Sequence, residues 1–210
     1  MTDLRRGSAG IIKAEPAAVL INKEESINVF ISEFIREFNS EFISESISEE
    51  KHMSRIKDLQ KQVHRVLKGM DDNQKRANAI AHLHGVSLAA VMIAKKRGED
   101  PELAAMAGLL HDLYAYKSGS YDDHAHKGAE YARKVLEELG ITSEEETAVI
   151  CSAIWHHDSK DQVDSAMDEI LKDADVIHHS LGDPTKEVKT HEQARYEQLS
   201  EEFGFCRQDG

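Results

Sequence analysis

The sequence predicts an all-α protein. Apolar residues recur at helical spacing through most of the chain, several of these stretches begin and end with helix-capping residues, and no stretch alternates apolar and polar residues as a strand does. At 210 residues, the chain is long enough for one domain with a substantial core and an appendage. We therefore divide it into an N-terminal extension, 1–52, and a helical domain, 53–210.

The extension contains an amphipathic helix. From Asn22 to Phe42 apolar residues follow helical spacing, and glutamates and serines occupy the opposite face. We interpret it as a helix packed on its own domain or on a second subunit, which would form a homodimer. The acidic face argues against a membrane-surface helix, whose polar face usually carries lysine and arginine. An alternative is that the core begins near Met53 and the extension is dispensable.

The helical domain is expected to contain a series of helices joined by short loops. Asp100 and Pro101 form a helix start signal, and the helix they begin leads to a His-Asp pair at 111–112. A loop is expected over 117–123. Periodicity and capping residues predict the other helices over 53–68, around 76–83 and 86–97, and over about 124–139, 142–157, 166–180 and 185–202.

Composition narrows the classes of function. The chain is 40% hydrophobic and 31% charged and has no apolar run of about 18 residues, so we expect no membrane span. The arginines near the N-terminus have no apolar region behind them, which argues against a secretory signal. With only Cys151 and Cys206, we expect reduced thiols and a cytoplasmic location. The net charge of −13 disfavours nucleic acid as a partner but permits a small phosphorylated substrate at a local cationic site.

The unusual feature is the set of 12 histidines, centred on the adjacent pair His111-Asp112. Neighbouring residues on a helix point in different directions, so both can face one ion only where an apolar helix ends at a cavity. The small residues of 104–108 would let other helices approach closely. We therefore predict a metal site at this pair.

The other candidate ligands also lie near predicted helix ends or loop edges. Taken singly, each histidine is more often a surface or core residue than a ligand. Imidazoles and carboxylates together suit divalent ions, here Mn, Fe, Co, Ni, Zn or Mg, and a set without cysteine leaves positions for water and phosphate oxygens. The candidates are His82 and His84, His111, Asp112, His124 and His126, His156 and His157, and Asp175.

In their order and spacing, these motifs resemble the HD-domain metal-dependent phosphohydrolases over about residues 77–180. The matching elements are His82 four residues before Val86, Asp100–Leu103, Leu109–Asp112, His124 four residues before Gly128, Ile154 three residues before His157, and Ala174-Asp175. Several elements in one order are far more specific than a lone His-Asp dipeptide. The register selects His82, His124 and His157 rather than the histidines beside them.

The resemblance implies a compact HD-type helical bundle and a set of metal ligands. His82, His111, Asp112 and Asp175 would hold one ion. His124 and His157, with Asp112 as a bridge, would hold a second, although a site with one ion stays open. The implied reaction is hydrolysis of a phosphoester or phosphoanhydride bond by a metal-activated water, with Asp112 positioning the water or accepting its proton. Lys117 is the candidate for neutralising phosphate charge.

The spacing of His111, His157 and Asp175 is closest to the branch of the superfamily that hydrolyses diadenosine tetraphosphate and related dinucleotides. The chain departs from that branch after the His-Asp pair, where Lys117 follows two positions after Ala115, and after Asp175. We expect a nucleotide or dinucleotide substrate. The alternatives are a regulatory module that holds a nucleotide or metal without turnover, and a di-iron oxygenase.

Overall fold

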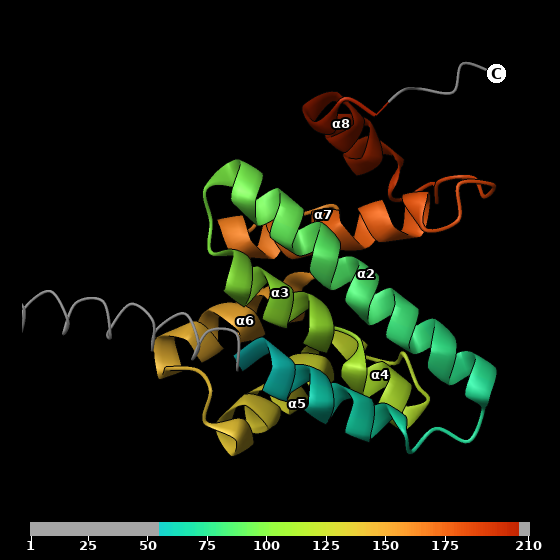
Figure 1. The fold of residues 1–210 in the computed structure, drawn as a ribbon. Helices are drawn as coiled ribbons and strands as arrows, with labels where there is room; N and C mark the ends of the chain where they lie inside the picture. The colour runs from blue at the N-terminus through green and yellow to red at the C-terminus, as the bar shows by residue number, and fades with distance from the viewer. Residues whose placement is uncertain (1–54, 206–210) are drawn as a thin grey trace, which may run out of the picture. The chain divides into compact units, whose positions relative to one another are not determined.

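The computed structural model describes residues 55–205 (Figure 1). The predicted extension 1–52, its amphipathic helix, the boundary at residue 53 and the homodimer through that helix lie outside the described residues. The described part belongs to the second of two units into which the chain divides, residues 51–210. Its regular elements are helices, and residues 55–205 contain no strand, so the predicted all-α fold class is confirmed.

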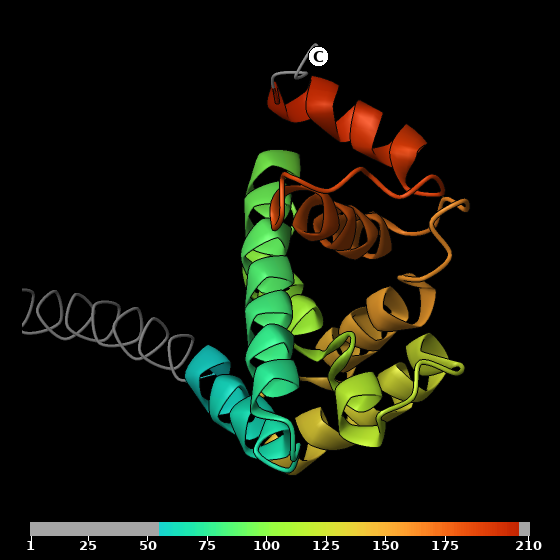
Figure 2. The same cartoon turned by 90° about the vertical axis from the view of Figure 1, so that its right-hand side faces the viewer.

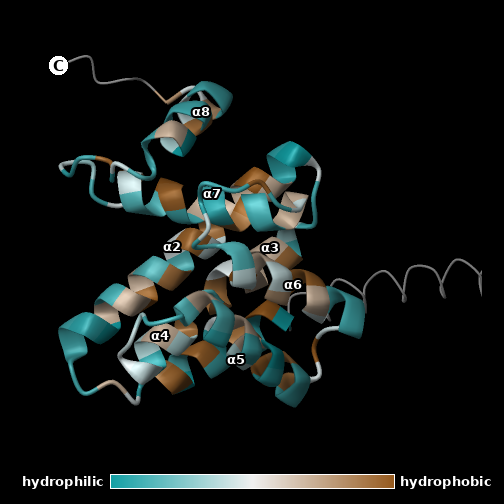
Figure 3. Cartoon of the chain, turned by 180° about the vertical axis from the view of Figure 1, so that it is seen from behind, coloured by the Kyte–Doolittle hydropathy of each residue, from teal (hydrophilic) through white to brown (hydrophobic). Residues whose placement is uncertain are grey.

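The helices form a bundle around one apolar core. The first described helix covers residues 55–67, and a turn joins it to the next. The helices that follow are α2 (Asn73–Arg97), α3 (Pro101–Leu110), α4 (Leu113–Ser118), α5 (His124–Leu139), α6 (Glu144–His156), α7 (Ala166–Leu181) and α8 (Gln193–Phe203). Viewed from behind and coloured by hydropathy, the bundle shows mostly hydrophilic residues on α8, which lies at its edge (Figure 3).

The long helix α2 runs along one side of the bundle, with α7 and α8 near its C-terminal half (Figure 2). It is long and apolar enough to cross a membrane by length and composition. In this fold, however, its apolar residues, among them Leu83, Val86 and Ile93, are buried in the core of the bundle. The core therefore accounts for the hydropathy of α2.

Local capping sets where α3 begins, and the helix leads directly to the His-Asp pair. The Asp100 side chain accepts hydrogen bonds from the backbone N–H groups of Glu102 and Leu103, and Pro101 occupies the first turn. The helix ends at Leu110, with His111 as its C-cap, and α4 begins one residue after Asp112. The pair thus lies at a helix end, as predicted.

Capping boxes begin the two helices that carry the later candidate ligands. Ser143 and Glu146 form one at the start of α6, and Ser165 and Asp168 form the other at the start of α7. These reciprocal hydrogen bonds satisfy backbone N–H groups in the first turn. They define where each helix starts, and so how far along it the ligands lie.

The structure corrects the prediction of two helices around 76–83 and 86–97, because α2 is continuous through Gly85. A glycine inside a helix costs about 1 kcal/mol relative to alanine. Here it allows a close contact, since a Cβ on Gly85 would lie 2.1 Å from His178 Cδ2 of α7. Packing between helices therefore overrides the local preference.

The prediction of a last helix over 185–202 is wrong in its first half, because α8 begins only at Gln193. Residues 183–192 instead form two turns joined by an irregular stretch. The Asp183 carboxylate accepts hydrogen bonds from the backbone and hydroxyl of Thr185, which favours a turn over a helix. The predicted loop at 117–123 also starts later, since α4 extends to Ser118.

Close packing of α2 on α3 depends on Gly108, which leads to a stability prediction. A Cβ on Gly108 would lie 2.6 Å from Ser87 Cα, and backbone cannot move aside as a flexible side chain can. We expect Gly108→Ala to destabilise the domain by about 1–3 kcal/mol, as overpacking does, measured by urea unfolding. An unobstructed helical Gly→Ala change would instead stabilise by roughly 0.5–1 kcal/mol, so the sign of the change tests the contact.

Candidate metal centre

The junction of α3 and α4 places His111 and Asp112 on a common site. His111 is fully buried, and its Nε2 lies 3.7 Å from Asp112 Oδ2. His82 of α2 adds a second imidazole, with Nε2 3.0 Å from His111 Nε2 and 3.6 Å from Asp112 Oδ2. Asp175 of α7 closes the group, with Oδ1 3.6 Å from His82 Nε2 and 3.8 Å from His111 Nε2. Three separate segments of the chain thus converge on one small volume.

Asp112 also faces a second group of nitrogen atoms through its other oxygen. His124 Nε2, at the start of α5, lies 3.5 Å from Asp112 Oδ1. His157 Nε2, at the end of α6, lies 3.6 Å from the same oxygen. One carboxylate therefore stands between two sets of imidazoles. This is the geometry that a carboxylate bridging two ions would require.

Backbone carbonyls orient three of these rings. The Nδ1 atoms of His111, His124 and His157 lie 2.9, 3.0 and 2.7 Å from the carbonyl oxygens of Gly108, Tyr121 and Ile154, respectively. A carbonyl can only accept, so each Nδ1 carries the proton and each Nε2 presents its lone pair to the site. Such hydrogen bonds fix the tautomer and orientation of metal-binding histidines.

The electrostatics of the site favour a cation. Oδ1 of Asp112 and Oδ1 of Asp175 are buried and have no hydrogen-bond partner among the described residues. Burial by itself would raise both pKa values, but the His111 ring beside Asp112 and the Lys160 ammonium beside Asp175 hold them well below the usual range. Burial lowers the pKa of His111 to about 3, far below its usual value. Buried carboxylate oxygens together with imidazole nitrogens are a ligand set that fits a divalent ion.

The two groups border a cavity of about 430 Å³. Its walls come from α2, α4, α5, the segment after α6, α7 and the segment before α8. The lining residues outside the two groups include Tyr116, Tyr121, Lys160, His179, Lys189 and Glu192. The cavity therefore combines aromatic and cationic side chains with the candidate metal ligands.

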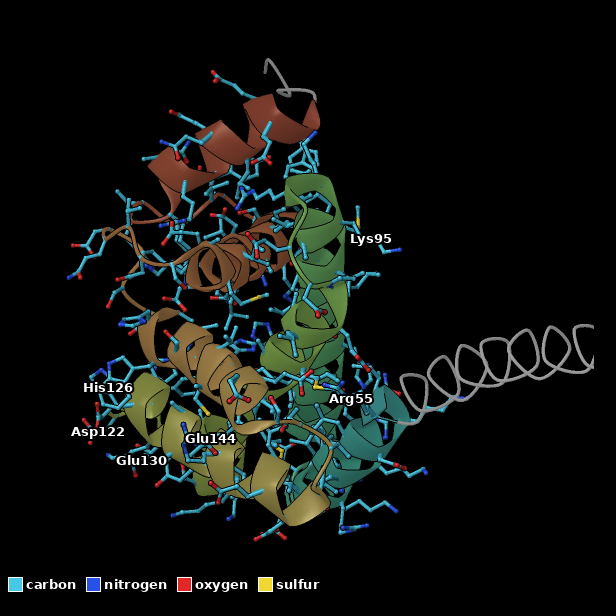
Figure 4. The ribbon with its side chains drawn as sticks, turned by 90° about the vertical axis from the view of Figure 1, so that its left-hand side faces the viewer. Arg55, Lys95, Asp122, His126, Glu130 and Glu144 are labelled. Atoms are coloured by element: carbon cyan, nitrogen blue, oxygen red, sulfur yellow. The ribbon has the colours of Figure 1, made fainter. Side chains whose placement is uncertain are left out.

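Two histidines that competed for the ligand positions lie outside this cavity. His84 Nε2 lies 3.1 Å from His64 Nε2 on the surface of the bundle. His126 pairs with Asp123 at 2.7 Å, and its ring packs 4.0 Å from the Trp155 ring. Figure 4 shows His126 at the outer edge of α5, beside Asp122. Neither imidazole reaches the His-Asp pair.

The third competitor, His156, is also held elsewhere. Its Nδ1 lies 3.0 Å from the carbonyl oxygen of Ser152 and 3.2 Å from Asp168 Oδ2. The histidines beside the pair are thus the ones that the register of the sequence selected. Their role as metal ligands stays a prediction.

Comparison with known proteins identifies the family. A sequence model of the HD domain matches residues 79–180. The Bacillus subtilis protein named "Putative phosphohydrolase YueE" is 30% identical over 120 residues, which cover 50% of this chain and 68% of that protein. The chain belongs to the HD-domain family. HD domains bind divalent metals, and the family assignment makes this protein a hydrolase of the metal-dependent phosphohydrolase type.

Two further proteins are similar to this HD domain. Ribonuclease Y of Chlorobium luteolum is 31% identical over 100 residues, which cover 48% of this chain but only 17% of that protein. A crystal structure described as a predicted HD superfamily hydrolase from an uncultured Thermotogales bacterium is 26% identical and superposes with a TM-score of 0.49 over 71% of this chain and 87% of that chain.

The position of Lys117 does not fit the phosphate-neutralising role predicted for it. Its Nζ lies over the Tyr131 ring, 4.1 Å from the centroid, and it does not line the cavity. The sequence suggested it because it closely follows Asp112. In α4, however, Tyr116 faces the cavity, and the next residue is rotated about 100° away.

Lys160 is the cation that sequence reasoning missed. Its side chain is buried, and Nζ donates to Asp175 Oδ2 at 2.7 Å. Burial alone would lower the pKa of Lys160, but the Asp175 charge raises it above the usual value, so the ammonium is charged. Its only sequence signal was its position three residues after His157, in a segment without helical periodicity.

Proposed function

We propose that this HD domain hydrolyses a phosphoester or phosphoanhydride bond of a small nucleotide, using one or two divalent ions. The observation that carries the proposal is the position of Asp112, whose two oxygens face two separate groups of imidazole nitrogens. A carboxylate so placed suits a pair of ions that share a phosphate and a water. Hydrolysis of a phosphate bond is the chemistry that such a pair supports best.

The site divides into two candidate ligand sets. His82, His111, Asp112 and Asp175 would hold the first ion, and Asp112, His124 and His157 the second. When bound, a divalent ion supplies a water whose pKa falls from ~15.7 toward about 7, and it polarises a phosphoryl oxygen. Within the site, backbone carbonyl groups hold three rings with Nε2 inward, and the Asp112 carboxylate lies where it would position the water.

The cavity wall supports a nucleotide as the substrate. The ring of Tyr121 is about half exposed and packs edge-on against Tyr116 and His124. A half-exposed aromatic ring beside the candidate metal ligands is suited to stack on a base. A volume of about 430 Å³ lies toward the lower end of ligand cavities, which span roughly 300–1,000 Å³. This size favours a mononucleotide over a dinucleotide that is bound whole.

Removing the metal is expected to stop turnover and to lower thermal stability together. A ligand present at about 100 times its Kd stabilises a protein by roughly 2.7 kcal/mol, which corresponds to a fall in Tm of roughly 5–11 °C on chelation for a domain of this size. Turnover would be measured on a panel of mononucleotides, dinucleotides and generic phosphodiesters. Adding back Mn, Co, Ni or Zn should restore both properties.

The same panel separates the enzyme from a regulatory module. A protein that retains a divalent ion but hydrolyses none of these substrates would contradict the proposed function. It would favour a domain that binds a nucleotide or a metal without turnover.

Replacing Lys160 and Lys117 by alanine, one at a time, tests which of the two ammonium groups binds the substrate phosphate. We expect Lys160→Ala to lower turnover by roughly 10–100-fold, the cost of losing a charged hydrogen bond of about 1.5–3 kcal/mol. Lys117→Ala should remain within about threefold of the wild type, because its ammonium lies over Tyr131. Metal content must be measured for both variants, since Lys160 also contacts Asp175. The reverse ranking of the two variants would count against this assignment.

A further inference from the structure

A histidine that is not one of the predicted ligands of the HD motif lies beside the first ligand group. His179 follows Asp175 by one turn of α7, and its Nε2 lies 3.4 Å from Asp175 Oδ1. Its ring stacks on that of His82, with centroids 5.5 Å apart and planes 17° apart. One nitrogen or oxygen atom from each of these three residues lies within 4.8 Å of the other two. His179 also lines the cavity.

A buried glutamate holds this ring from its other side. Glu192, immediately before α8, is fully buried, and its Oε1 lies 2.9 Å from His179 Nδ1. Burial alone would raise the pKa of Glu192, but the hydrogen bond with His179 keeps it below its usual value. The carboxylate accepts, so Nδ1 carries the proton of this hydrogen bond, and Nε2 is the ring nitrogen directed toward Asp175. Carboxylate partners of this kind orient and strengthen metal-binding imidazoles.

Lys189 competes with Glu192 for the same nitrogen. Its Nζ lies 3.0 Å from His179 Nδ1 and 3.4 Å from Glu192 Oε1. A ring nitrogen has one in-plane position for a partner. The lysine side chain is about half exposed and can turn to water, whereas the buried carboxylate needs a donor from the protein. The pairing of Glu192 with His179 is therefore the stronger one.

A simple hydrogen bond from His179 to Asp175 does not explain the arrangement. Asp175 Oδ1 has no hydrogen-bond partner among residues 55–205, although three imidazoles surround it. A buried carboxylate oxygen with three imidazole nitrogens at 3.4, 3.6 and 3.8 Å, and no hydrogen bond to any of them, is an arrangement that a shared cation would complete. The contact at 3.4 Å is therefore better explained by a shared ion than by a structural bond.

We propose that His179, oriented by Glu192, is an additional ligand of the first metal ion. This inference rests on the proposed function, because it assumes that His82, His111, Asp112 and Asp175 hold that ion. The extended set contains three imidazole nitrogens and two carboxylate oxygens. Such a set favours a borderline transition ion such as Mn, Fe, Co, Ni or Zn over Mg²⁺, which prefers oxygen ligands and retains several waters.

Cobalt binding to the full-length protein tests the proposal without relying on activity. Co²⁺ affinity is measured by calorimetry, and its coordination by the visible absorption spectrum. Losing a residue that only hydrogen-bonds to a metal ligand already weakens metal binding by roughly 10–100-fold. We therefore expect His179→Ala, which removes a ligand, to weaken Co²⁺ binding by about 100-fold or more and to change the absorption spectrum. Glu192→Gln should weaken binding by roughly 10-fold. Mg²⁺ should not displace Co²⁺ from the wild type at equal concentration.

Two variants at neighbouring positions serve as controls. His191 contacts Glu192 only at 3.7 Å, and its side chain is exposed. His191→Ala should therefore leave the Co²⁺ affinity and the absorption spectrum unchanged. Lys189→Ala should do the same, since the proposal gives it no part in holding the ring. A loss in Lys189→Ala equal to that in His179→Ala would overturn the role of Glu192.

An unchanged affinity and spectrum in His179→Ala would overturn the proposal. Where the alanine variant fails to fold, His179→Gln keeps the volume of the side chain and answers the same question. A wild-type protein that binds no Co²⁺ would refute the proposed function itself. The two failures are therefore distinguishable.

Discussion

Replacing Asp112 by alanine is expected to remove bound metal and turnover in a single step. Its Oδ2 faces His82 and His111, and its Oδ1 faces His124 and His157. No other carboxylate among the described residues stands between the two groups. Loss of an outer partner of a ligand already costs roughly 10–100-fold in metal affinity or activity, so the loss for this shared residue should exceed 100-fold. Metal content after dialysis and turnover on the best substrate are the two measurements.

Asp158→Ala is the matched control for this variant. Asp158 also lines the cavity but belongs to neither ligand group. It should keep its metal and lose little activity, because its carboxylate contributes only to the charge of the wall. Unaltered metal content in Asp112→Ala, with a circular dichroism spectrum like that of the wild type, would refute the assignment of the site.

The second large effect concerns stability. Lys172 of α7 is fully buried, and its Nζ donates to the carbonyl oxygen of Gln162 at 3.0 Å, to Asp164 Oδ2 at 2.5 Å and to Glu169 Oε1 at 2.8 Å. Lys172→Ala leaves these acceptors without their cation. Breaking a buried ion pair costs about 3–5 kcal/mol, a large share of the roughly 5–15 kcal/mol that stabilises a domain. Urea unfolding measures this loss.

The effect should extend to the site, because Lys172 fixes the segment between α6 and α7 that also carries Lys160. We therefore expect weaker metal retention in Lys172→Ala even where the protein still folds. Lys186→Ala is the control, since Lys186 is exposed and pairs with Asp183 at the surface; its change should stay within about 0.5 kcal/mol. A loss below about 1 kcal/mol in Lys172→Ala would show that the buried network is not a major source of stability.

Local features of the sequence predicted most of the helices and the position of the His-Asp pair at a helix end. Asp100 with Pro101 and the capping boxes at Ser143 and Ser165 act within one turn, so their effect can be read from adjacent residues. The position of His111 and Asp112 at a helix end follows from the same signals. The register of the family motif added the choice of His82, His124 and His157.

Errors arose where contacts between distant segments decide the outcome. α2 continues through Gly85 because His178 packs against it. Residues 183–192 form two turns joined by an irregular stretch, and this segment brings Glu192 to His179. Lys117 follows the pair closely in sequence but turns to Tyr131. No periodicity or short motif contains these contacts.

Local sequence patterns were sufficient to predict the all-α class, most helix boundaries and the chemical type of the candidate site, because caps, periodicity and motif spacing involve neighbouring residues. Three features depend on contacts between distant segments: which cation lines the site, the placement of the two Asp112 oxygens toward two groups, and the position of the His179–Glu192 pair at the cavity. Each of these depends on how the helices and the segments between them pack against one another. A rotation of about 100°, the angle between successive helical residues, is enough to exchange a buried ligand for an exposed side chain.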